Sequence, residues 1–148
     1  MKRLALSCLA GLACLAALIA FPAMAQTPGA TQIEVEARPV INRWIAAFNR
    51  GDVAAMAVDV YSKANEAGLK ASFAALREEQ FGKLDIYSAG FCSTDAAHGK
   101  AILKYGRLYT FGGLMDGDEA RVFDLVKTDA GWRISGEADV AFETALSC

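Results

Sequence analysis

The chain has 148 residues, with 15 Lys and Arg against 17 Asp and Glu and a formal net charge of −2. This length supports one domain with a single core and is too short for two. The slightly acidic balance argues against nucleic acid or anionic lipid as a partner. The sequence holds one histidine and four cysteines without the spacing of a zinc site, so we expect no metal and no cofactor.

Residues 1–25 predict an export signal that is cleaved after Ala25. They contain a positive start, an apolar run over 4–21 and a small-x-small cleavage site at 23–25. A lipoprotein is the alternative, because Cys14 follows Gly-Leu-Ala, although the apolar run continues past that cysteine. Without the signal, 13 Lys and Arg face 17 Asp and Glu, a net charge of about −4. We therefore expect a periplasmic or secreted protein with no membrane span in its mature chain.

The mature chain begins with a flexible leader at 26–30, and residues 31–148 are expected to form one domain. A capping box at Thr31 and Glu34 predicts the start of a helix. Its apolar positions recur at helical spacing and form one face, namely Val40, Ile41, Trp44, Ile45 and Phe48. Pro39 interrupts this pattern, and it either kinks the helix or marks its true start.

Gly51 and Asp52 predict a corner between two helices. Glycine enters the left-handed conformation that ends a helix without a Cβ penalty. The Asp52 carboxylate can then cap a second, short helix that reaches about Tyr61. A third helix is expected from about Leu69 to Phe81, with Gly82 as its C-cap.

After Gly82 the apolar period changes from about 3.6 to about 2, which predicts strands. The expected strands cover 84–92 (with a possible bulge at 89–90), 100–111, 119–128 and 132–140. A turn covers 93–99, and a hairpin loop covers 112–118. The tail to Cys148 is either a short fifth strand or loose. Helices followed by an antiparallel meander predict an α+β fold, with N-terminal helices packed on a four- to five-stranded sheet.

Cys92 and Cys148 are the cysteines that remain after the signal is removed. In an oxidising compartment an even pair indicates a disulfide, which we favour here. Two unpaired thiols, one in a strand and one on the tail, are the alternative.

The helix with Trp44 and Phe48, the Gly51-Asp52 corner and the closing hairpin at 129–134 resemble the nuclear transport factor 2-like superfamily. The resemblance implies a cone-shaped α+β domain in which a curved sheet wraps a long helix. The chain looks most like small exported bacterial members of unknown function. Since that superfamily includes isomerases, binding modules and structural subunits, the resemblance does not decide the function.

A binding pocket is expected where aromatic side chains gather in this cone. In the strand over 100–111, residues 103, 105, 107, 109 and 111 share one face by alternation. With the first helix they suggest a pocket for a planar or anionic ligand, lined by Trp44, Phe48, Tyr105, Arg107 and Tyr109. The same stripe is also typical of a core that ends in an arginine reaching for solvent.

Three residues are candidates for acid–base chemistry. By the resemblance, Asp59 and Tyr61 lie near the mouth of the cone, where an isomerase would hold a base and a donor. Asp124 is a carboxylate in an otherwise apolar strand, so it faces either solvent or the cavity. His98 is expected to be an exposed turn residue. Trp132 is expected to pack, with its indole N–H donating to a carbonyl.

Three functions remain open on this basis. The first is a non-catalytic envelope domain that binds a small molecule or a partner protein. The second is a small isomerase or lyase with an Asp base and a Tyr donor. The third is a structural subunit that forms a homodimer through its sheet face.

Overall fold

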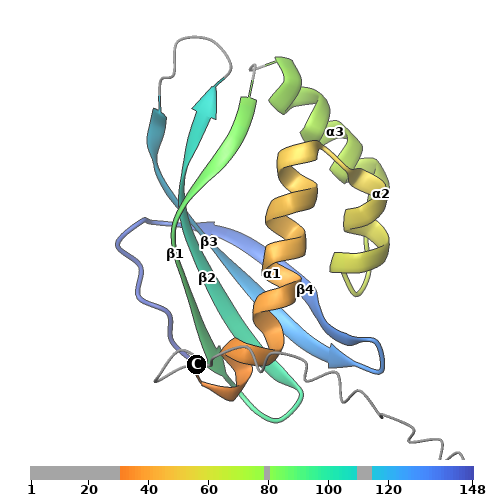
Figure 1. Ribbon diagram of the computed structural model, residues 1–148, viewed down its shortest axis with the longest axis vertical. Coiled ribbons are helices and arrows are strands. Elements are labelled where there is room, and N and C mark those ends of the chain that lie inside the picture. Colours follow the sequence, from red (N-terminus) through yellow and green to blue (C-terminus); the bar gives the residue numbers. More distant parts are fainter. Residues whose placement is uncertain (1–30, 79–80, 110–114) are drawn as a thin grey trace, which may run out of the picture.

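The computed structural model describes residues 31–78, 81–109 and 115–148. The predicted export signal and the leader at 26–30 lie outside the described residues. Within these residues three helices, the second of which ends in a π-helical turn, precede four strands, which confirms the predicted α+β class. The helices lie on one side of the curved sheet (Figure 1).

The first helix, α1 (Gln32–Arg50), begins and ends where the sequence predicts. The Thr31 side chain accepts a hydrogen bond from the Glu34 N–H, and Gly51 ends the helix with φ 63°. The Glu34 carboxylate pairs with Arg38 in the next turn. Pro39 lies inside the helix, so it does not mark the start.

The second helical segment is short and changes its hydrogen-bonding pattern. It consists of α2 (Val53–Ala55) followed by the π-helical turn η1 (Met56–Val60). The Asp52 carboxylate accepts from the Ala55 N–H at 3.0 Å, as expected of an N-cap.

The third helix, α3 (Glu66–Glu78), begins and ends earlier than predicted. Phe81 and Gly82, expected as its end and cap, are the first residues of β1 (Phe81–Ser93). The Phe81 ring lies 5.5 Å from that of Phe48 in α1. Phe81 therefore packs against α1 from a strand and not from the face of a helix. Short apolar runs do not distinguish the two structures by period alone.

The strands form an antiparallel meander in the order β1-β2-β3-β4. The other strands are β2 (His98–Tyr109), β3 (Met115–Thr128) and β4 (Gly131–Val140). The predicted bulge at 89–90 is wrong, because the register of β1 shifts between Phe81 and Lys83 and between Ile86 and Ser88. Residues 115–118 of the predicted hairpin loop belong to β3, while residues 110–114, where the second predicted strand ends and the loop begins, lie outside the described residues.

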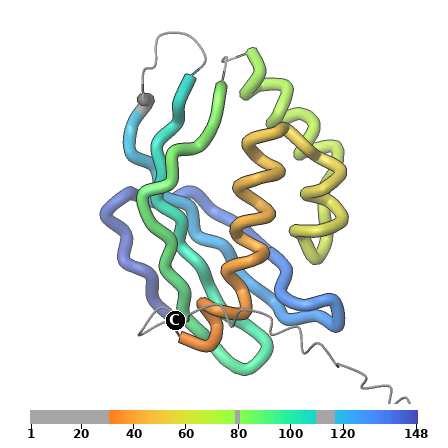
Figure 2. Tube along the Cα trace, in the orientation of Figure 1, coloured from red at the N-terminus to blue at the C-terminus, as the bar shows by residue number. Residues whose placement is uncertain are grey.

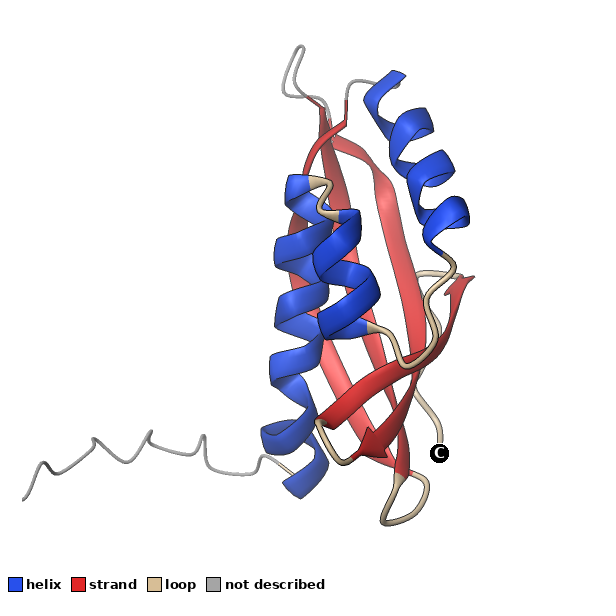
Figure 3. Cartoon of the chain, turned by 90° about the vertical axis from the view of Figure 1, so that its right-hand side faces the viewer, coloured by secondary structure: helices blue, strands red, loops and turns tan. Residues whose placement is uncertain are grey.

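The core lies between α1 and the concave face of the sheet. Trp44 from α1 and Phe123 from β3 are both 0% exposed, with ring centroids 5.0 Å apart. Figures 2 and 3 show α1 along the sheet, with α2 and α3 beside it.

The C-terminal tail, residues 141–148, is not a fifth strand. It runs on the side of the sheet away from the helices (Figure 1). The predicted disulfide is present, and it joins Cys92 of β1 to Cys148 with the Cα atoms 6.0 Å apart. The Phe142 ring lies 6.1 Å from that of Tyr87, and Lys104 Nζ lies 5.0 Å from the Phe142 ring centroid. The tail thus covers part of the outer face of the sheet.

Candidate functional site

Two adjoining hollows open beside α3. The central pocket has a volume of about 330 Å³ and lies between α1, α3 and the sheet. Its lining is Trp44, Phe48, Met56, Tyr61, Leu69, Ser72, Phe73, Ala75, Leu76, Arg107, Arg121 and Glu137. The side pocket, about 310 Å³, shares four of these residues, namely Tyr61, Leu69, Ser72 and Glu137.

Aromatic rings from two helices form the apolar wall of the central pocket. Trp44 and Phe48 stand one helical turn apart on α1, and their ring centroids are 4.8 Å apart. Phe73, from α3, lies 5.3 Å from Phe48. Phe73 is also the buried residue that docks α3 onto the rest of the domain. The wall therefore depends on the packing of α3 against α1.

A chain of hydrogen bonds crosses the floor of the same pocket. The Trp44 indole N–H donates to the Tyr61 hydroxyl at 3.0 Å, and that hydroxyl donates to Glu137 Oε2 at 2.9 Å. Tyr61 reaches this position because η1 ends there and the chain pairs with Ile134 of β4. One hydroxyl thus connects α1, η1 and β4.

Two arginines of the pocket are paired with carboxylates. Arg107 Nη2 donates to Glu119 Oε2 at 2.9 Å, and its Nε lies 2.8 Å from Glu119 Oε1. Arg121 Nε lies 2.7 Å from Asp139 Oδ1, and its Nη1 lies 3.5 Å from Glu137 Oε1. The Arg121 guanidinium also lies 5.6 Å from the Trp44 ring centroid. Both cations are therefore held by acids before any ligand binds.

Burial perturbs the tyrosines near the pocket. Burial, reinforced by the charge of Glu137, raises the pKa of Tyr61 above its ordinary value. Burial also raises the pKa of Tyr105 to about 12. Both phenols stay protonated at neutral pH, so Tyr61 remains a hydrogen-bond donor to Glu137.

The structure brings together some, but not all, of the predicted pocket residues. Trp44, Phe48 and Arg107 line the central pocket. Tyr105 is 2% exposed and belongs to the core, and Tyr109 is half-buried and is not part of the pocket lining. Glu137 was not predicted, because its partner Tyr61 is 76 residues away and no local pattern connects the two.

The predicted acid–base residues have different environments. Tyr61 lies in the pocket, but Asp59 and Asp124 are exposed, and neither lines the central or the side pocket. His98 is exposed, but it is the first residue of β2 and not part of the turn, and its Nδ1 lies 3.0 Å from Asp95 Oδ2. Among the described residues, no group of three His, Cys, Asp or Glu is placed to hold a metal ion.

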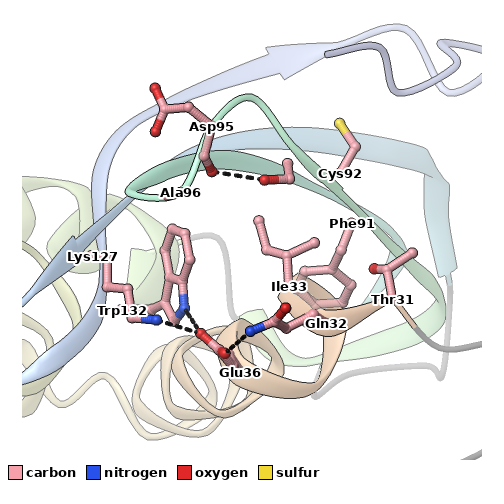
Figure 4. Close-up of a pocket in the computed structure, with 11 residues that line it drawn as sticks. Thr31, Gln32, Ile33, Glu36, Phe91, Cys92, Asp95, Ala96, Lys127 and Trp132 are labelled. Atoms are coloured by element: carbon pink, nitrogen blue, oxygen red, sulfur yellow. Dashed lines mark hydrogen bonds and ion pairs between the residues drawn. The ribbon is translucent and has the colours of Figure 1, made fainter.

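A larger hollow of about 520 Å³, the N-terminal pocket, lies at the start of α1 (Figure 4). One of its two carboxylates, Glu36, accepts from Lys127 Nζ at 2.7 Å, Trp132 Nε1 at 3.1 Å and Gln32 Nε2 at 2.8 Å. Trp132 was expected to reach a carbonyl and reaches this carboxylate instead. The donors hold the pKa of Glu36 at about 2, with Lys127 the largest contributor. Because its polar groups satisfy one another, this larger hollow is the weaker candidate site.

Among the described residues, no helix is long and apolar enough to cross a membrane.

The comparison with known proteins gives different results for the sequence and for the fold. No protein-family model matches the chain, and no curated protein matches it either. Solved structures do match, at low identity. A domain of unknown function with a cystatin-like fold from Nostoc punctiforme is 15% identical, with a TM-score of 0.59 over 74% of this chain and 78% of that one.

Two further structures agree with this. An NTF2-like protein with a cystatin-like fold from Novosphingobium aromaticivorans is 18% identical, with a TM-score of 0.56 over 76% of this chain and 83% of that one. A ketosteroid isomerase-like protein from Erwinia carotovora atroseptica is 14% identical, with a TM-score of 0.50 over 76% and 99%. Likeness at such identities shows fold and not activity. The chain therefore has the nuclear transport factor 2-like, cystatin-like α+β fold, as its sequence led us to expect.

Proposed function

We propose that this chain is an exported, non-catalytic domain of the cell envelope that binds a small, largely apolar molecule in the central pocket. The observation that carries the proposal is the lining of that pocket. Aromatic and aliphatic side chains surround a few converging polar groups, the composition typical of small-molecule sites. At about 330 Å³, the volume suits a ligand built on a single ring.

Export is supported by two features. The first 25 residues have the sequence pattern of a signal peptide. The disulfide between Cys92 and Cys148 is of the kind that persists in oxidising compartments.

The other two functions have less support. An isomerase would need a desolvated acid, whereas Asp59 and Asp124 are both exposed. A dimer formed through the outer sheet face would have to displace the C-terminal tail, which is bonded to β1 through Cys92.

A titration of full-length mature chain with 2-phenylethanol tests the binding proposal. We expect saturable binding at about 1 mM or below, within the range that so small a ligand can reach. Ser72 is exposed on α3 and lines the pocket, so Ser72→Trp should fill the hollow and abolish binding. Ala74→Trp is the matched control, since Ala74 is exposed on the same helix and does not line the pocket. Equal binding by both variants would place the ligand elsewhere, and no binding by the unmodified chain would count against the proposal.

A further inference from the structure

The charges around the central pocket are unequal. Two arginines, Arg107 and Arg121, face three carboxylates, those of Glu119, Glu137 and Asp139. The cluster therefore carries a net charge of −1. In formal charge, a bound carboxylate would bring the cluster to −2 and a bound cation would bring it to zero. Asp139 contributes least to this balance, because 69% of its side chain is exposed.

Both arginines are also occupied geometrically. An anion on Arg107 or Arg121 would have to share the guanidinium with a carboxylate that it already contacts at 2.7 to 2.9 Å, and the two like charges would repel each other. Such pairs are costly to break, because each leaves a partly buried charge without its partner. The anionic ligand suggested by the sequence is thus disfavoured by the partners of the arginines.

Glu137 differs from the other acids in the cluster because it borders both pockets. A carboxylate offers about four acceptor positions. Within the described part of the chain, Glu137 accepts from Tyr61 at 2.9 Å and meets Arg121 at 3.5 Å. By contrast, Glu36 in the N-terminal pocket accepts from three donors at 3.1 Å or less. Glu137 therefore keeps capacity for a further donor, at the junction of the two pockets.

We infer that the ligand of the central pocket is an amine, with an apolar body among the aromatic rings and a protonated nitrogen that donates to Glu137. The half-buried Phe48 ring supports this assignment as well, because aromatic faces attract cations, whereas Trp44 is fully buried and already has Arg121 over its ring. Lys63 borders the side pocket, but it is exposed, as Asp139 of the cluster is, so solvent and salt screen both of these charges.

This inference rests on the proposed function, since it names the class of ligand for the same pocket. It is tested with three probes of similar size: 2-phenylethylamine as the cation, 2-phenylethanol as the neutral form and 3-phenylpropionate as the anion. Dissociation constants are measured by calorimetric titration at low ionic strength. We expect the amine to bind at least 10-fold more tightly than the anion, with the alcohol between them.

Glu137→Gln keeps the size of the side chain and removes its charge. In this variant the amine should lose most of its advantage over the alcohol, while the alcohol binds as before. Asp124→Asn is the matched control, because it removes an exposed carboxylate that lines neither pocket. Its probe preference should be unchanged.

The outcomes separate the two proposals. Anion binding equal to or tighter than amine binding would overturn the amine inference and leave the small-molecule pocket standing. An amine preference that survives Glu137→Gln would also overturn it. If none of the three probes binds, the proposed function itself fails.

Discussion

The Tyr61 hydroxyl is the point where the helical layer and the last strand exchange hydrogen bonds. It accepts from Trp44, which is fully buried, and donates to Glu137. A buried indole N–H that loses its acceptor pays the full cost of desolvation. The same residue therefore contributes to both the stability of the domain and the shape of the pocket.

Tyr61→Phe should lower the free energy of unfolding by about 2 kcal/mol, because it leaves the Trp44 N–H buried without an acceptor. Urea unfolding followed by tryptophan fluorescence measures the change. Tyr87→Phe serves as the control, since Tyr87 is 42% exposed on the outer face and should cost less than about 0.5 kcal/mol. Equal effects of the two substitutions would contradict the role assigned to Tyr61.

Glu36 makes the free energy of unfolding depend on pH in the acidic range. Its pKa lies at about 2 in the folded chain, below its value of 4.5 when unperturbed. The ionised carboxylate therefore stabilises the fold above about pH 4.5, and this contribution is lost as the pH falls toward 2. The stability difference between the unmodified chain and Glu36→Gln should shrink over that window in urea unfolding series. A difference independent of pH would show that the hydrogen bonds to Glu36 do not favour its charged form.

At the scale of elements, the C-terminal tail crosses the outer face of the sheet and covers part of it. The disulfide closes it onto β1 across a sequence separation of 56 residues. Ile102, only 6% exposed, lies on this face outside the main core cluster. Leu146 packs nearby, with its Cδ2 4.0 Å from where a Cβ on Gly90 would stand. The tail therefore buries apolar surface that the helices do not reach.

Replacing both cysteines by serine should lower stability by up to about 4 kcal/mol, because the unfolded chain regains the entropy of the closed loop. Chemical unfolding of the oxidised chain, the reduced chain and the double variant measures this. The reduced chain and the double variant should agree. A loss below about 1 kcal/mol would mean that the tail stays in place without the bond.

At the scale of the whole molecule, the wall of the central pocket is formed by two helices that are anchored to the core to very different extents. Helix α1 buries six residues in the core, whereas α3 buries only Phe73. Elements with few buried apolar contacts open with the smallest free energy. The wall of the proposed ligand site thus includes a helix that we expect to open with a small free energy.

Hydrogen exchange should show this difference directly. Amides of α3 should exchange well before those of α1 and of β2 and β3, and a bound amine should slow α3 most. Mass-resolved exchange with and without 2-phenylethylamine measures both effects. Protection of α3 equal to that of α1 in the free protein would contradict this account.

The sequence alone determined the order of helices and strands, because caps and apolar periods act over a few residues. The Thr31 and Asp52 caps, the Gly51 stop and the change of period after Gly82 all place elements correctly to within a few residues. The sequence predictions were wrong at Phe81, where helix and strand patterns overlap, and at the bulge of β1, whose position depends on pairing with β2.

Only the tertiary structure decided which side chains meet. Tyr61 and Glu137 are 76 residues apart, and Glu36 and Trp132 are 96 apart. Such contacts depend on strand register and on the docking of helices, which no local pattern encodes. The sequence therefore indicated an aromatic stripe with arginines, while the fold determined that those arginines are already paired and that Glu137 faces the pocket.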